Sequence, residues 1–188
     1  METVISKHEK ETEFLVRCAG GFEEVLAKEL ISIGCKHVKP IKGGVLFAGV
    51  FADGLRVCLW SRAATRVLME IARMSAHNAD TLYAGVFKVP WEKIIAPSAT
   101  IAMHATGQNS ALRNTQFTAL KVKDAVCDRL VAERGGRPDV DGADPDFPIE
   151  VVIYRDRATI YLNLSGPALH RRGYREPGVQ SEAPLKET

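Results

Sequence analysis

The chain has 188 residues, enough for one domain or two small ones, and 46% of them are hydrophobic, as is usual in folded soluble proteins. The 25 Lys and Arg residues nearly balance the 23 Asp and Glu residues, so overall charge indicates no particular partner, and any nucleic-acid surface must come from the placement of charges. No apolar run approaches the roughly 18 residues of a membrane span and none resembles a signal peptide, which argues against a membrane protein and predicts a cytoplasmic one.

The four cysteines agree with that compartment. Cys18, Cys35, Cys58 and Cys127 form no CxxC pair, and most of them occupy positions with an apolar pattern. We interpret them as reduced, buried thiols, and no metal site is predicted.

The first half of the chain has the order of elements of a ferredoxin-like domain. A polar lead at 1–12 is expected to be mobile. Hydrophobic periodicity and turn residues then predict a strand at 14–18, a helix at 22–33, strands at 37–41 and 45–48, a helix at 53–62 and a strand at 67–71. The order β-α-β-β-α-β is that of the ferredoxin-like fold, which we assign to 13–75.

Each predicted helix of this half has an apolar face. The face of the first helix consists of Phe22, Val25, Leu26, Leu30 and Ile33. Asp53 is the expected N-cap of the second helix. The residues that the second helix is expected to bury are Leu55, Cys58 and Leu59.

The second half, 76–166, predicts another small α/β layer. The expected elements are a helix at 80–87, a strand at 100–106, a long helix from 114 or 115 to about 135, and strands at 149–154 and 159–164. The last two strands alternate as a hairpin does and are expected to close a second sheet. The fold class is therefore α+β.

Two polar features of this half have alternative interpretations. His104 could be a ligand or a base, but no Cys, Asp or His stands at ligand spacing, which favours a hydrogen-bonded strand histidine. The loop 137–148 carries four aspartates. The Gly and the terminal Glu of a calcium-binding EF-hand are not in place, so a solvated loop is predicted.

The long helix offers the first clue to function. Its apolar arc is expected to contain Ala119, Leu120, Val122, Val126, Cys127, Leu130 and Val131, with Thr118 on the opposite side. Lys123 projects into the middle of this arc, where an ammonium group must reach an edge or meet an anion. Arg113 stands beside the N-terminus, which Asn114 or Thr115 caps. This combination suits a phosphate; a capped amphipathic helix with a solvated arginine is the alternative.

The tail, 167–188, differs in composition from the rest. The stretch His170-Arg171-Arg172-Gly173-Tyr174-Arg175 combines three arginines with a tyrosine, which suits phosphates beside a stacking platform and equally suits a solvated linker. In Ala183-Pro184-Leu185-Lys186-Glu187-Thr188 a proline stands where a helix would begin. We expect that this polypeptide was cut from a longer one.

Several stretches resemble those of a known protein family and occur in the same order as in that family. They are Gly21-Phe22-Glu23-Glu24-Val25-Leu26, Gly43-Gly44-Val45-Leu46-Phe47, Trp60-Ser61-Arg62, Arg113-Asn114-Thr115-Gln116-Phe117, Lys121-Val122-Lys123-Asp124-Ala125 and Leu162-Asn163-Leu164-Ser165-Gly166, followed by the two tail stretches. With these residues the chain resembles the N-terminal portion of the bacterial THUMP-containing 23S rRNA guanine-N2 methyltransferases. The tail stretches are the most specific.

The resemblance implies a ferredoxin-like domain at 13–75 and a THUMP domain at 76–166, which a wider family definition would start at about 53. Residues 167–188 would be the linker and the start of an absent methyltransferase domain. In the family that domain uses S-adenosylmethionine to methylate the N2 atom of a guanine in 23S rRNA. No glycine-rich cofactor motif and no Asn-Pro-Pro-type tetrapeptide occurs in this chain. The chain is therefore expected to be catalytically inactive, to bind no cofactor, and to have 23S rRNA and its own C-terminal methyltransferase domain as partners.

The residues and the resemblance together predict the RNA contacts. These are Arg113, Asn114, Gln116, Lys121, Lys123, Arg171, Arg172, Tyr174 and Arg175. The residues of the tail could instead dock on the absent domain.

Three other functions are weighed against this one. The first is a THUMP module of a tRNA-modifying enzyme, which the two tail stretches disfavour. The second is a non-catalytic protein-interaction domain, which the near-neutral charge favours. The third is a small-molecule enzyme, for which no nucleophile, base and orienting residue fall into a recognisable arrangement.

Overall fold

Residues 11–171 are the part of the chain that the computed structural model describes. Their first six elements follow the predicted ferredoxin-like order. They are β1 (Thr12–Arg17), α2 (Glu23–Ser32), β2 (Lys36–Ile41), β3 (Gly44–Gly49), α3 (Phe51–Trp60) and β4 (Arg66–Ser75). The elements that follow are α4 (Ala79–Phe87), a 3-10 turn (Trp91–Lys93), β5 (Ile101–Thr106), α5 (Thr115–Arg134), β6 (Phe147–Tyr154), β7 (Arg157–Asn163) and a second 3-10 turn (Leu169–Arg171).

The core of the first half lies between its strands and its two helices. Alternation along β1 points Phe14 and Val16 toward α2 and α3, and Leu15 to the other face of the sheet. Phe14 stacks on Phe47 of β3, with ring centres 4.6 Å apart. The predicted α+β class with a ferredoxin-like unit is confirmed.

The predicted faces of α2 and α3 are partly wrong. Helix α2 buries Leu26, Ala27 and Leu30, and it leaves Phe22 and Val25 about half exposed. The residues that α3 buries are Gly54 and Val57, whereas Leu59 is 71% exposed. Leu55 is also exposed, at 41%, and Cys58 is half-buried.

Glycine at position 54 explains how α3 is rotated. A Cβ atom there would lie 2.5 Å from the ring of Phe14 and 2.7 Å from Leu164, so only glycine lets the helix approach the sheet on this side. Asp53 also differs from its predicted role, because Val50 is the N-cap residue. The Asp53 carboxylate accepts a hydrogen bond of 3.0 Å from the Val50 amide one turn back.

Helix α5 is turned about its axis relative to the prediction. Thr118 is buried, and its hydroxyl donates to the Asn114 carbonyl at 3.0 Å, while Leu120 and Val131 are 49% and 41% exposed. Asn114 is the N-cap and accepts from the Phe117 amide at 3.0 Å. Lys123 does not lie in the middle of the buried arc. Its side chain is 32% exposed, with its ammonium 3.7 Å from the Asp124 carboxylate, so it needs no further anion.

The two halves share one sheet, which corrects the predicted second sheet. Strand β4 is twice as long as the strand predicted at 67–71. It pairs antiparallel with β7, from Leu68 opposite Asn163 to Ser75 opposite Arg157. The resulting seven-stranded order is β2-β3-β1-β4-β7-β6-β5, with β5 and β6 the parallel pair. Local alternation could not predict this pairing because it joins strands about 90 residues apart.

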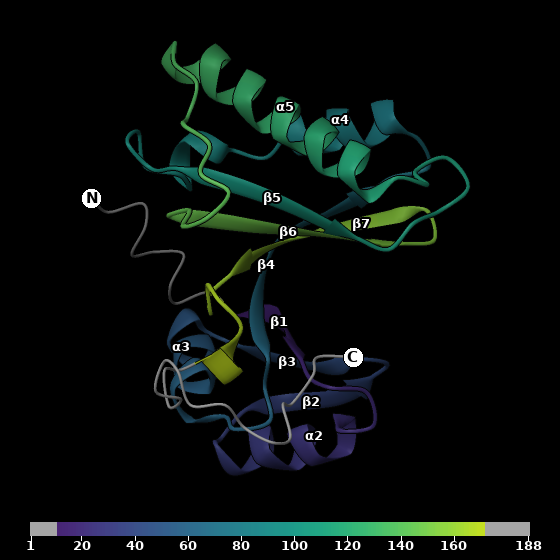
Figure 1. Ribbon diagram of the computed structural model, residues 1–188, viewed down its shortest axis with the longest axis vertical. Coiled ribbons are helices and arrows are strands. Elements are labelled where there is room, and N and C mark those ends of the chain that lie inside the picture. Colours follow the sequence, from purple (N-terminus) through teal and green to yellow (C-terminus); the bar gives the residue numbers. More distant parts are fainter. Residues whose placement is uncertain (1–10, 172–188) are drawn as a thin grey trace, which may run out of the picture.

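The four α-helices found within residues 11–171 cover the same face of this sheet. Helices α4 and α5 lie over β5, β6 and β7, and α2 and α3 lie against β1 and β3 at the other end (Figure 1). The sheet twists and bends between the two ends, so that its helix-free face becomes concave. No helix within residues 11–171 has the length and hydrophobicity needed to cross a membrane.

Candidate nucleic-acid interface

A groove follows the concave, helix-free face of the sheet, with a volume of about 1170 Å³. Its floor contains the apolar cluster of the face that carries no helix: Leu15 and Leu46 from the first half, and Val152 and Tyr161 from the second. Burial raises the pKa of Tyr161 to about 12, so its hydroxyl keeps its proton at neutral pH. The groove lies close to the upper end of the roughly 300–1,000 Å³ range of small-molecule pockets, and its charged rim suits an extended anionic ligand.

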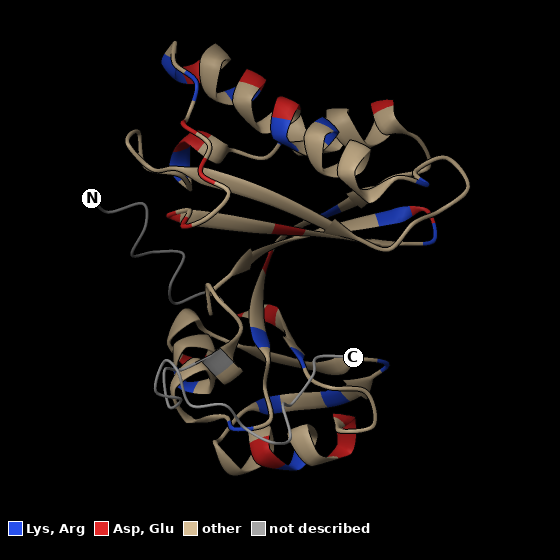
Figure 2. Cartoon of the chain, in the orientation of Figure 1, with Lys and Arg blue, Asp and Glu red and all other residues tan. Residues whose placement is uncertain are grey.

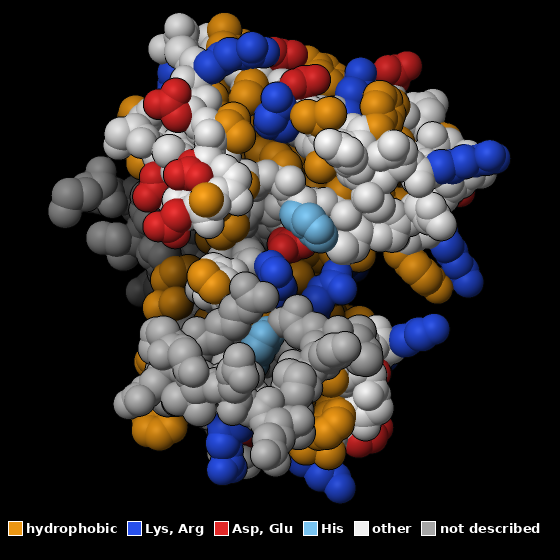
Figure 3. Space-filling model, in the orientation of Figure 1, with side chains coloured by type: hydrophobic (Ala, Val, Ile, Leu, Met, Phe, Trp, Pro, Cys, Tyr) orange, Lys and Arg blue, Asp and Glu red, His pale blue; other side chains and the backbone are white. Residues whose placement is uncertain are grey.

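The rim of the groove is basic. Its charged residues are Arg17, Lys39, Lys42, Arg73, Arg155 and Arg157, against two carboxylates, Glu13 and Asp156. Within the described residues, only Arg73 of these six lies within ion-pair distance of carboxylates, 2.7 Å from Glu13 and 2.5 Å from Glu70. In the described part of the chain, five cations therefore face the groove without a carboxylate partner. Basic side chains project from both halves beside the notch between them (Figure 3).

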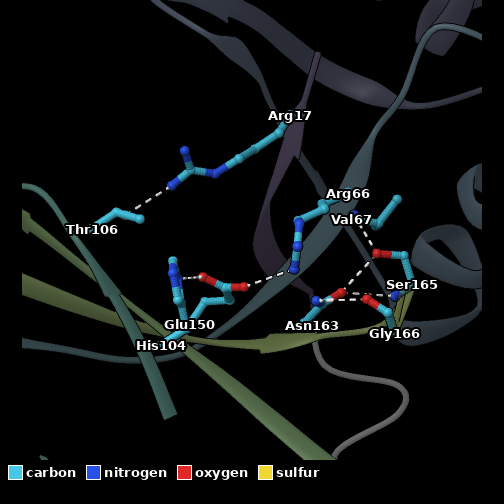
Figure 4. A network of polar contacts seen from close by, with 9 residues as sticks. All are labelled: Arg17, Arg66, Val67, His104, Thr106, Glu150, Asn163, Ser165 and Gly166. Carbon is cyan, nitrogen blue, oxygen red and sulfur yellow. Dashed lines mark hydrogen bonds and ion pairs between the residues drawn. The ribbon is translucent and has the colours of Figure 1, made fainter. Parts of the chain in front are cut away.

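Arg17 is the rim cation that reaches from one half to the other. It sits at the end of β1, and its guanidinium donates to the hydroxyl of Thr106 on β5 at 3.1 Å (Figure 4). Arg66, its neighbour across the β1–β4 pair, makes an ion pair instead, because its guanidinium lies 3.1 Å from the Glu150 carboxylate. Of these two adjacent arginines, one is neutralised and the other is available to an anion.

Glu150 connects the halves on the helix-free face. It is 5% exposed and contacts Arg66 on one side and the imidazole of His104 on the other, 3.0 Å from Nδ1 (Figure 4). His104 is thus a hydrogen-bonded strand histidine, the interpretation that the sequence favoured. A buried carboxylate with two partners connects β5 and β6 to the start of β4.

Removing one partner of this carboxylate should destabilise the fold. We expect Arg66→Ala to lower the free energy of unfolding by about 1–3 kcal/mol, because Glu150 would keep a buried charge with one partner fewer. The control is Arg62→Ala, whose side chain is 94% exposed and 3.8 Å from Glu29, with an expected effect within about 0.5 kcal/mol. Urea unfolding of both variants measures this, and equal effects would contradict the role given to Glu150.

The turns that bear the rim residues are held by the backbone. At the β2–β3 turn the Gly43 amide donates to the Glu23 carboxylate at 2.9 Å, which holds the pKa of Glu23 below its ordinary value. At the β6–β7 turn, pairing continues up to Tyr154 opposite Arg157, and Arg155 adopts a φ of +52°, rare for a residue with a side chain. The guanidinium of Arg155 lies 5.4 Å from the centre of the Tyr154 ring.

The predicted contacts at the start of α5 lie away from the groove. Arg113 is exposed and its Nε donates to the Ser110 carbonyl at 2.9 Å; Gln116 is exposed in the first turn. Asn114 uses its side chain as the helix cap, so it already occupies one of the amides that a phosphate would take. Lys121 and Lys123 are two residues apart on α5, about 200° around the helix, so their side chains do not point to the same place.

Acidic neighbours reduce the charge of α5. The ammonium of Lys121 lies 3.8 Å from Asp80 and 5.0 Å from the centre of the Tyr83 ring. Lys123 is near Asp124, and acidic and basic positions are interspersed along the helix (Figure 2). The helix surface is therefore closer to neutral than the groove. Of the predicted tail contacts, Arg171 ends the second 3-10 turn, and Arg172, Tyr174 and Arg175 lie outside the described residues.

Two carboxylates of the loop 137–148 accept hydrogen bonds from backbone amides. Asp141 accepts from the amides of Ala143 and Asp144, and Asp146 accepts from the amide and the hydroxyl of Thr100. These hydrogen bonds hold the pKa of both carboxyl groups below the ordinary value. Within residues 11–171 no three His, Cys, Asp or Glu side chains are grouped to bind a metal ion.

The two halves of the sheet correspond to two recognised domains. The chain matches the THUMP domain family over residues 76–163 and the RlmL ferredoxin-like domain over residues 13–68. It therefore belongs to the THUMP-domain proteins and carries the RlmL type of ferredoxin-like domain before the THUMP domain.

Within that class, the chain is similar to particular methyltransferases. It is 43% identical over 175 residues to the ribosomal RNA large subunit methyltransferase K/L of Aeromonas hydrophila, a match that covers 93% of this chain and 24% of that protein. The chain thus spans about a quarter of the length of such curated relatives.

Two solved structures have the same fold. A predicted N6-adenine-specific DNA methylase from Listeria monocytogenes superimposes with a TM-score of 0.80 at 28% identity, covering 94% of this chain and 46% of the other. The putative methyltransferase SMU.472, solved in complex with SAH, gives a TM-score of 0.77 at 25% identity, covering 89% of this chain and 45% of the other.

Proposed function

We propose that this chain is the RNA-binding region of an S-adenosylmethionine-dependent rRNA methyltransferase that acts on guanine N2 in 23S rRNA. The name of the Aeromonas relative supports the rRNA substrate, and the SAH complex of SMU.472 supports the methyl donor. In this proposal the chain binds and orients RNA in the cytoplasm. A methyltransferase domain after 167–188 performs the transfer, and the chain alone binds no cofactor and has no activity.

One observation carries the RNA-binding proposal: among residues 11–171, five groove cations, contributed by both halves, have no carboxylate partner. Phosphates are the ligands that such a set attracts, because each contact releases counterions from the nucleic acid. The groove lies along the junction of the two halves, so the ferredoxin-like part, 13–75, and the THUMP part, 76–166, would bind the same RNA. The start of α5, with Arg113, Asn114 and Gln116, remains a second proposed surface, together with Lys121 and Lys123.

Binding of the 188-residue chain to a panel of nucleic acids tests this function. The panel contains rRNA hairpins, tRNA and duplex DNA, each titrated over a range of salt. We expect the chain to prefer structured rRNA. For each tenfold increase in salt concentration, the logarithm of the association constant should fall by about 0.7–0.9 for each phosphate contact. Preference for tRNA would assign the chain to a tRNA-modifying enzyme. If the chain bound no RNA at low salt, or bound RNA with an affinity that did not change with salt, an RNA-binding function for the chain by itself would be contradicted.

A further inference from the structure

The groove has two kinds of surface, and their arrangement restricts the RNA that can fill it. Its floor is apolar, formed by Leu15, Leu46, Val152 and Tyr161, and its cations stand along the rim. An RNA duplex presents phosphates outward and keeps its bases stacked inside. A duplex could meet the rim but would leave the apolar floor uncovered. An unpaired strand can turn its bases to the floor and its phosphates to the rim.

Tyr154 stands at the mouth of this groove. This residue is 69% exposed although it is the last residue of β6, and it lines the groove with Arg155 beside its ring. A large aromatic side chain left mostly in solvent buries little apolar area in the fold, so packing alone does not explain its presence. The backbone at Tyr154 is held in place because β6 and β7 pair up to this residue, which fixes where the ring leaves the sheet. Exposed aromatic rings next to arginine are typical stacking platforms for nucleic-acid bases.

We propose that the groove binds an unpaired RNA strand, with bases on the apolar floor and the base at the mouth stacked on Tyr154. This inference rests on the proposed RNA-binding function and names the form of RNA that the site selects. Arg17 and Arg157 then contact the phosphates that flank the stacked base, one from each half of the molecule. The ring supplies affinity for any base, because every base has a π face.

The test uses an rRNA hairpin with an unpaired segment and the same hairpin with that segment paired to a complementary strand. A 2-aminopurine in the unpaired segment reports stacking through the quenching of its fluorescence. We expect the wild-type chain to bind the unpaired form at least tenfold more tightly and to quench the probe. Tyr154→Ala should lose about tenfold in affinity for the unpaired form and lose the quenching, while Tyr154→Phe, which keeps the ring, should retain both.

The outcomes separate this inference from the function on which it rests. Equal, salt-dependent binding of both RNA forms, or a Tyr154→Ala variant that binds and quenches like the wild type, would overturn the inference and leave RNA binding intact. If the wild-type chain bound neither RNA at low salt, both the inference and the proposed function would be overturned. Because Tyr154 is exposed, its variants are expected to fold, which thermal unfolding verifies.

Discussion

Alanine at Arg17, Arg155 and Arg157 together should weaken RNA binding by roughly 10- to 100-fold near 0.1 M salt and reduce the salt slope by about two units. The three side chains come from both halves and face the groove without a carboxylate partner among the described residues. Each would release bound counterions by meeting one phosphate, and alanine removes that contribution. Titration of an rRNA hairpin at several salt concentrations measures both quantities.

A second triple variant provides the comparison between the two proposed surfaces. Alanine at Arg113, Lys121 and Lys123 removes the same number of charges from α5. We expect a smaller loss, because Lys121 and Lys123 lie within 4 Å of Asp80 and Asp124 respectively and their removal frees those carboxylates. The reverse order of effects would place the RNA on α5 and would contradict the groove as the main interface.

Trp91→Ala should lower the free energy of unfolding by about 3–5 kcal/mol. Trp91 is fully buried beneath α4 and α5, and its indole Nε1 donates to the Val86 carbonyl at 2.8 Å. The alanine variant leaves a cavity and removes one of the hydrogen bonds to the Val86 carbonyl, which still accepts from the Val89 amide at 3.1 Å. Because β4 and β7 join the two halves in one sheet, we expect a single unfolding transition whose midpoint falls by about 10 °C.

Trp60→Ala is the matched control for that measurement. Trp60 ends α3 and is 70% exposed, so its removal should change the free energy of unfolding by less than about 1 kcal/mol. Calorimetry of both variants distinguishes one cooperative unit from two. Two separate transitions, with only one moved by Trp91→Ala, would show that the shared sheet does not couple the halves.

Local pattern was enough to predict most elements of this protein. The signals used depend on neighbours within a few residues. Examples are the alternation of Phe14 and Val16 against Leu15 in a strand, and the residues Asn114 and Gly135 at the two ends of a helix. The ferredoxin-like order followed from these elements in sequence. The family resemblance then added the THUMP part, which the residue match at 76–163 supports.

Helix rotation was not predictable in the same way. Both faces of α5 carry large apolar residues, so periodicity could not show that Thr118 is buried while Leu120 is exposed. On α3 the deciding residue is Gly54, which has no side chain and therefore contributes nothing to an apolar pattern. The tertiary contact selects the face because close approach to Phe14 requires a missing Cβ atom, whatever the hydrophobicity of the neighbours.

The candidate interface depends on tertiary structure most of all. Its cations lie on four strands and two turns, with Arg17 and Arg157 140 positions apart, and each alone resembles an ordinary solvated residue. The sequence by itself determined the elements, their order and the family, because these depend on local spacing and on contiguous motifs. Only the tertiary structure decided that the two halves share one sheet, that its helix-free face is concave, and which cations lack a carboxylate partner, because those properties arise from pairing between strands distant in the chain.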